Sequence, residues 1–137
     1  MYTLEEISAL RQKCASLELE GREILDRFSD EELQLHCNGI GPESLPAWAR
    51  KFVSMLHPTL EPAAFIHDAE WSASECSKEH FSLTNARFKS NGYTCARAAY
   101  KWYNPLRCLV MNQARRFGNY CEYFGFSVYK EAKACSE

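Results

Sequence analysis

The chain has 137 residues, of which 46% are hydrophobic, 13% aromatic and 25% charged, and its formal net charge at pH 7 is −2. This composition excludes an intrinsically disordered chain, and the length suits a single domain with its own hydrophobic core. No apolar run approaches the roughly 20 residues that a membrane-spanning helix needs, and the first residues lack the basic and apolar segments of a signal peptide. We therefore expect one domain without a transmembrane segment, located in the cytoplasm or exported without a cleaved signal peptide.

The charges are divided unevenly along the chain. Residues 1–86 hold 7 Lys and Arg against 15 Asp and Glu, whereas residues 87–137 hold 9 against 3. An acidic segment attracts cations, and a basic segment attracts phosphate groups on lipids or nucleic acids. The two segments could equally attract each other within the fold, so this asymmetry alone does not define a partner.

The cysteines do not follow the spacing of a zinc site. There are seven of them, and no two form a C-x-x-C pair. We expect reduced thiols in a cytoplasm, several of them buried as small hydrophobic side chains. They are Cys14, Cys37, Cys76, Cys95, Cys108, Cys121 and Cys135.

The first predicted element is an amphipathic helix over residues 4–28. Thr3 and Glu6 form the pattern of a capping box, and apolar residues then recur every three or four positions for about seven turns. Ser29 and Glu32 repeat the capping-box pattern, so a second helix is expected to begin there. The first helix carries no candidate chemistry, and we interpret it as an accessory packing element.

Residues 37–42, with the sequence CNGIGP, interrupt the helical pattern. Two glycines flank one residue and a proline follows, which predicts a tight loop with exposed backbone groups. Such a loop can present carbonyl groups to a cation or amide groups to an anion, although most loops of this kind are simple turns.

The next two predicted helices lead to the residues with the clearest chemical potential. One spans residues 45–57, and Thr59 is expected to cap the other, which contains His67 and Asp68. His67 can take up a proton near neutral pH, and Asp68 can bind a hard cation. Because adjacent residues of a helix point about 100° apart, the two side chains would perform different tasks. One could act as a base while the other binds a metal ion beside it.

The remainder of the chain is also predicted to be helical, with helices at residues 78–92 and 94–103 and a last helix that Asn104 caps. Apolar side chains at intervals of three and four indicate core-facing stripes in these helices. Gly118 and Gly125 would let another helix approach closely, or could mark a break. With no convincing strand pattern, the expected fold class is all-α.

Several of these features together resemble the phospholipase A2 superfamily, most closely its small phage- and prophage-type members, which carry a CNGxGP loop and an HDxxY helix. The motifs that carry the resemblance are residues 37–42, His67, Asp68, Trp71, Phe81 and Asn85. The likeness covers about residues 35–130. It implies an antiparallel helix pair at the centre of a core over residues 29–137, with residues 1–28 added in front and a long C-terminal helix.

The resemblance also implies a reaction, the Ca²⁺-dependent hydrolysis of a phospholipid ester. Asp68 would be the carboxylate ligand of the calcium ion, and backbone carbonyls around Cys37, Gly39 and Gly41 would complete the site. His67 would be the general base that deprotonates the attacking water, and the Gly39 amide could add an oxyanion donor. No acyl-enzyme intermediate is expected, because water is the nucleophile.

Three positions depart from the family pattern, all of them expected beside the candidate base. The family has an aspartate that orients the histidine about three residues before Phe81, where this chain has Lys78, a cation that would repel an imidazolium. Trp71 replaces a tyrosine, and Glu70 occupies the position of a disulfide cysteine in secreted relatives. We expect a Glu70–Lys78 ion pair to replace both the disulfide and the aspartate.

These departures leave other hypotheses open. His67 could be an ordinary buried core histidine, and the protein could be a catalytically impaired module that binds lipid, a protein partner or nucleic acid. Arginines, lysines and aromatic residues interleave over residues 87–116, as in proteins that bind a phosphate backbone and stack bases. Nucleic acid is the less favoured partner because no nucleic-acid-binding motif is present, and an anionic membrane surface would suit the same cations. A metal-dependent phosphohydrolase of the HD type is close to excluded, since it would need a later aspartate and none follows Asp68.

Overall fold

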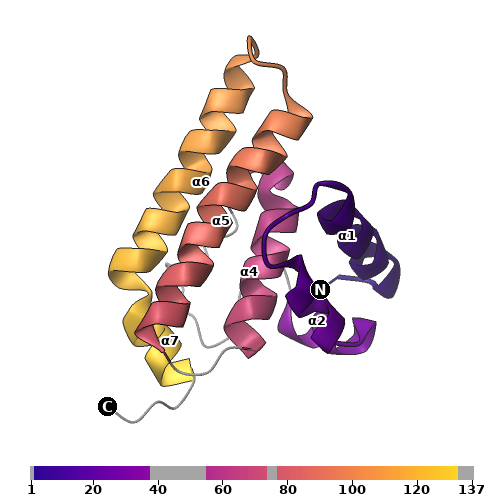
Figure 1. Cartoon of the computed structure of the whole chain (residues 1–137), viewed down its shortest axis with the longest axis vertical. Helices are drawn as coiled ribbons and strands as arrows, with labels where there is room; N and C mark the ends of the chain where they lie inside the picture. Colours follow the sequence, from indigo (N-terminus) through magenta and orange to yellow (C-terminus); the bar gives the residue numbers. More distant parts are fainter. Residues whose placement is uncertain (1, 38–54, 74–76, 133–137) are drawn as a thin grey trace.

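The computed structural model describes residues 2–37, 55–73 and 77–132, and the regular structure in these ranges is entirely helical, which confirms the all-α expectation (Figure 1). The elements are α1 (Leu4–Ser16), η1 (Arg22–Arg27), α2 (Asp30–His36), η2 (Pro58–Leu60), α4 (Glu61–Ala73), α5 (Lys78–Ala99), α6 (Pro105–Phe124) and α7 (Phe126–Ala132). The long helices α5 and α6 form a hairpin, α4 packs against α5, and α1 and α2 cover α4. No helix in the described ranges is long and apolar enough to cross a membrane.

The prediction of one helix over residues 4–28 is wrong, because the chain turns after the fourth turn of α1. Glu18, just beyond the end of α1, has a left-handed φ of 52°, and Gly21, with a left-handed φ of 79°, precedes the start of η1. The turn is fixed by α5, where the buried Asn91 side chain accepts a hydrogen bond from the Glu20 amide at 2.7 Å and donates one to the Glu20 carbonyl at 2.9 Å. A tertiary contact therefore overrides the apolar periodicity of this segment.

Most of the predicted helix caps are confirmed. The side chains of Thr3, Ser29 and Asn104 each accept a backbone N–H in the first turn of α1, α2 and α6. Thr59 does not cap the helix that carries the candidate base. His57 does so instead, since its Nδ1 accepts the Thr59 amide at 3.1 Å and starts η2, which continues directly into α4.

Glycines in α5 and α6 serve close packing more often than helix termination. The predicted end of a helix at Gly92 is wrong, because α5 continues through it to residue 99. A Cβ atom at Gly92 would lie 2.5 Å from the Ala114 Cβ and 3.2 Å from the Leu60 Cδ2, so this glycine lets α5 approach α6 and η2. Gly118 lies against α5 in the same way, whereas Gly125 ends α6.

Apolar side chains from all the longer helices share one core, and it includes α1 through Ile7, Leu10 and Cys14. The N-terminal helix is therefore packed into the same core as the helix pair α4–α5. The five cysteines in the described ranges are free thiols, three of them buried. Of the predicted 37–42 loop, only Cys37 belongs to the described residues. Of the predicted helix at residues 45–57, only residues 55–57 belong to them.

Candidate functional site

The centre of the candidate site is His67, which α4 places against α5 and α6. Its side chain is 6% exposed and lies edge-on to three aromatic rings, with centroid distances of 5.6 Å to Phe88 and 6.3 Å to Phe117 and Trp71. Burial lowers the pKa of His67, and a hydrogen bond to Asn85 opposes this effect only in part. The imidazole is therefore neutral near pH 7 and able to accept a proton.

A chain of polar contacts leads from His67 across the helix hairpin. The Nε2 of His67 lies 3.0 Å from the Oδ1 of Asn85 in α5, and the Nδ2 of Asn85 donates to the Oε2 of Glu122 in α6 at 3.0 Å. The hydroxyl of Ser82 donates to the other oxygen of Glu122 at 2.6 Å. Three neighbouring helices thus contribute one member each to a His67–Asn85–Glu122 relay.

The charge of Glu122 fixes the direction of every hydrogen bond in this relay. Burial tends to raise the pKa of Glu122, but hydrogen bonds from Asn85 and Ser82 and the charge of Lys78 outweigh it, so the pKa is lowered. An ionised carboxylate can only accept hydrogen bonds, so Asn85 turns its amide nitrogen to Glu122 and its oxygen to His67. The Nε2 of His67 must then carry the proton, which leaves Nδ1 with the free lone pair of a base.

Asp68 is half-buried on the next position of α4, and it lies near the start of the predicted calcium loop. Burial raises the pKa of Asp68 to about 7, and no described cation lowers it. Burial, followed by the charge of Asp68, also raises the pKa of the Cys37 thiol. Because Cys37 is the first residue of the CNGIGP loop and its thiol donates to the Phe65 carbonyl at 3.6 Å, the fold brings the loop entrance to α4.

Asp68 suits a hard cation, because it is a half-buried carboxylate with no positive partner among the described residues. Gly39 and Gly41, the other predicted sources of ligands, lie outside those residues. Within residues 2–37, 55–73 and 77–132, no group of three or more His, Cys, Asp or Glu side chains could hold a metal ion.

The expected Glu70–Lys78 ion pair is not formed. Glu70 is buried and pairs with Arg87 of α5, with 2.6 Å between Oε2 and the guanidinium nitrogen. Lys78 lies 3.9 Å from Glu122 and its ammonium group sits over the rings of Phe81 and Phe126. The two side chains therefore belong to different contacts, Glu70 with α5 through Arg87 and Lys78 with Glu122, Phe81 and Phe126.

This arrangement corrects the expectation about which residue supports the histidine. Asn85, not Lys78, contacts the His67 ring nitrogen, and Lys78 is placed beyond Glu122, where it balances that carboxylate. Trp71 does lie beside His67 as expected, and its ring also packs against Tyr129 of α7 at 5.8 Å. The histidine therefore contacts the amide of Asn85, and the carboxylate of Glu122 lies on the far side of that amide.

Sequence reasoning did not find Glu122, although one signal was available. It is the only acidic residue between positions 80 and 130, a segment rich in Lys and Arg. A lone carboxylate among these cations is a candidate for a specific partner. The 37 residues that separate it from Asn85 hid the identity of that partner.

Comparisons of the chain with protein-family models, with curated protein sequences and with solved structures found no match. The resemblance to the phospholipase A2 superfamily therefore stands on the motif residues of the chain itself. What the site can do has to be argued from the His67–Asn85–Glu122 relay and from the carboxylate of Asp68.

Proposed function

We propose that this protein is a hydrolase of the phospholipase A2 type, which cleaves a phospholipid ester with water that His67 activates. The observation that carries the proposal is the relay, in which a buried imidazole with a lowered pKa contacts Asn85 and, through it, Glu122; from these contacts we infer that the proton of the neutral ring is on Nε2 and that Nδ1 is the base. A base with these properties, beside a carboxylate suited to a hard cation, is what hydrolysis by an activated water requires.

In the proposed reaction, the Nδ1 of His67 takes a proton from water as the water oxygen forms a bond to the ester carbonyl carbon. The acyl–oxygen bond then breaks, and the imidazolium returns the proton to the departing alcohol. While His67 is positively charged, the Asn85 carbonyl dipole faces it at Nε2, and the Glu122 carboxylate behind Asn85 supplies the compensating negative charge. Glu122 is therefore a positioning residue that acts through Asn85.

Calcium is the proposed cofactor, with Asp68 as its carboxylate ligand and backbone carbonyls around Cys37, Gly39 and Gly41 as its further ligands. When bound, it would polarise the ester carbonyl and hold the lipid phosphate. The Gly39 amide would add a donor to the developing oxyanion. The phospholipid itself, presented by an anionic membrane surface, is the proposed partner.

The test is the release of fatty acid from mixed phospholipid vesicles, measured with Ca²⁺ and with a chelator. The purified protein is compared with His67→Ala and Asp68→Ala, and with Glu79→Gln as a control at an exposed carboxylate of the same hairpin. Release that requires Ca²⁺ and both side chains supports the proposal. No release under any lipid or calcium condition, from protein with wild-type helical content by circular dichroism, would contradict it.

One observation favours a second candidate, a catalytically impaired module that binds lipid or a protein partner. The residue in contact with His67 is the amide of Asn85, which cannot take a proton from the imidazole and carries no charge of its own. Replacing it by Asn85→Asp discriminates between the two candidates. If the wild type is inactive and Asn85→Asp gains hydrolysis, the protein is a catalytically impaired enzyme. If the wild type already hydrolyses phospholipid, the impaired-module candidate is wrong.

A further inference from the structure

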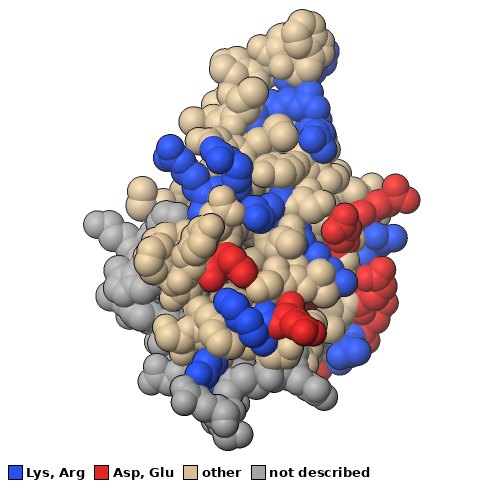
Figure 2. Space-filling model, turned by 60° about the vertical axis from the view of Figure 1, so that its left-hand side comes forward, with Lys and Arg blue, Asp and Glu red and all other residues tan. Residues whose placement is uncertain are grey.

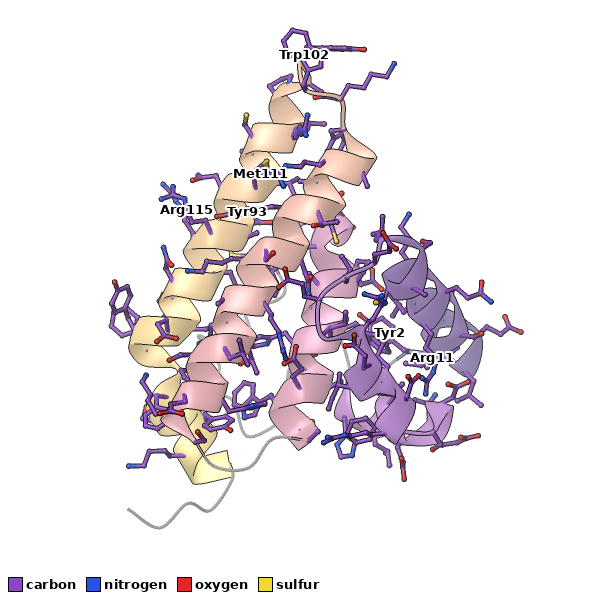
Figure 3. The ribbon with its side chains drawn as sticks, viewed as in Figure 1. Tyr2, Arg11, Tyr93, Trp102, Met111 and Arg115 are labelled. Carbon is purple, nitrogen blue, oxygen red and sulfur yellow. The ribbon has the colours of Figure 1, made fainter. Side chains whose placement is uncertain are left out.

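The turn between α5 and α6 exposes an unusual concentration of apolar side chains. Trp102 is 80% exposed and Leu109 is 60% exposed, and Tyr103 and Leu106 are also exposed beside them. The rings of Trp102 and Tyr103 contact each other edge-on, with 5.6 Å between centroids. Trp102 lies at the extreme end of the hairpin, away from α1, α2 and α4 (Figure 3). We call these four residues the hairpin tip.

The hairpin segment that carries the tip is basic. Residues 80–121, which include most of α5 and nearly all of α6, contain seven Lys and Arg and no Asp or Glu. Two of these cations, Arg87 and Lys89, contact Glu70 and Asn119 lower in the hairpin. Arg97 and Lys101 are exposed close to the tip, and Figure 2 shows Lys and Arg without Asp or Glu over the upper part of the face it presents.

We propose that the hairpin tip anchors the protein in the interface of an anionic lipid bilayer. Tryptophan and tyrosine prefer the boundary between lipid headgroups and acyl chains, and leucine inserts just below it. Arginine and lysine around such a group gain from the negative surface potential of anionic lipids. The exposed tip and its flanking cations supply both contributions at one end of the molecule.

Two other occupants fit the same residues less well. A single-stranded nucleic acid would use the aromatic rings and the cations, but Leu106 and Leu109 offer no ring on which a base could stack. A second copy of this chain would bring two basic surfaces together, which like-charge repulsion opposes. The combination of leucine, tryptophan and exposed cations on the same hairpin therefore favours a bilayer.

The hairpin tip is separate from the candidate site. In α5, Asn85 belongs to the relay and Ala99 is the last residue before the turn that carries the tip. At a rise of 1.5 Å per residue, the tip lies about 20 Å from the relay along the helix. The anchoring proposal therefore does not rest on hydrolysis at His67. Either proposal can fail while the other stands, provided that binding is measured without turnover.

The test is co-sedimentation with phosphatidylcholine vesicles that contain or lack phosphatidylserine, carried out in the presence of a chelator. We expect binding only to the anionic vesicles and a loss of binding as salt is raised. Trp102→Ser should weaken binding about tenfold or more, since it removes the aromatic side chain that the proposed complex buries in the bilayer interface. Arg97→Gln and Lys101→Gln should each weaken it about fivefold.

The matched control is Leu35→Ser, because Leu35 is 72% exposed on α2 but follows Glu31 and Glu32 in an acidic surround. This variant should bind as the wild type does. Tryptophan fluorescence gives an independent measurement, since a blue shift on addition of anionic vesicles should disappear in Trp102→Phe while co-sedimentation persists.

Four results would each overturn the proposal. They are equal binding to neutral vesicles, equal losses in Trp102→Ser and Leu35→Ser, salt-sensitive binding to an oligonucleotide but not to anionic vesicles, and a dimer in solution that Trp102→Ser dissociates. The third result would identify a nucleic-acid surface. The last would show that a second copy of the chain covers the tip.

Discussion

The two ends of the α5–α6 hairpin use charge in opposite ways. Near the start of α5, the carboxylate of Glu122 accepts hydrogen bonds from Asn85 and Ser82 and lies close to Lys78. At the other end, Arg97 and Lys101 surround exposed aromatic and leucine side chains, and no acidic residue lies between positions 80 and 121. The first arrangement fixes the position of a proton, whereas the second leaves charge and apolar surface available to a partner. One pair of helices therefore serves as a rigid frame for a site and as a separate surface.

The largest effect on hydrolysis should come from removing His67, the proton acceptor of the candidate site. His67→Asn removes the proton acceptor with little change of volume, and it should lower fatty-acid release about 10²–10⁴-fold. Vesicle binding in chelator should not change, because the hairpin tip is untouched. A variant that loses binding and hydrolysis together would show that the two ends of the hairpin are not independent.

The rigidity of the frame itself can be tested at Gly92. Gly92→Ala places a Cβ 2.5 Å from that of Ala114, so α5 and α6 must separate, and the free energy of unfolding should fall by about 1–3 kcal/mol. The measurement is urea denaturation followed by circular dichroism. The double variant with Gly92→Ala and Ala114→Gly restores the space and should recover a large part of the loss. Equal stability of wild type and Gly92→Ala would contradict the close approach.

The sequence predicts the frame better than it predicts the contacts within it. Apolar residues at intervals of three and four are local signals, and so are the caps at Ser29 and Asn104. Together they are enough to predict an all-helical fold. The break after α1 and the continuation of α5 through Gly92 depend on side chains from other helices, so no local pattern reveals them. Asn91, for example, holds the turn at Glu20, which is 71 residues away in the chain.

The candidate site shows the same division. The spacing within α4 is enough to select His67 and Asp68, because both lie in one helix. Their partners depend on the length of the connection between α4 and α5, which sets the register of the two helices. The sequence interpretation placed Lys78 beside His67 because the resemblance puts the supporting aspartate about three residues before Phe81, whereas the residue that contacts His67 is Asn85, one turn after Phe81.

A smaller effect is expected when the relay loses its charge. Glu122→Gln keeps the shape but removes the negative charge behind Asn85, and it should reduce fatty-acid release about tenfold or less, since Glu122 acts only through another residue. The lowered pKa of Glu122 also predicts a stability effect. A lowered folded-state pKa gives stability that is present above the ordinary value of 4.5 and is lost as pH falls through the folded-state value.

Wild type should therefore lose more stability than Glu122→Gln when the pH falls from 7 to below 4.5, as measured by urea denaturation at each pH. Glu79→Gln, at an exposed carboxylate of α5, should follow the wild type. Parallel pH profiles for wild type and Glu122→Gln would mean that the hydrogen bonds from Asn85 and Ser82 do not stabilise the ionised carboxylate.

The smallest effect on folding is expected at the hairpin tip. Trp102→Ser removes a side chain that is 80% exposed and contributes little to the core, so the free energy of unfolding should change by about 0.5 kcal/mol or less. The same change should weaken binding to anionic vesicles strongly. This contrast between an unchanged stability and a lost interaction is the property that distinguishes a binding surface from a packing surface. If Trp102→Ser destabilised the fold by as much as Gly92→Ala, the tip would be part of the frame, and its exposed side chains would need no partner to account for them.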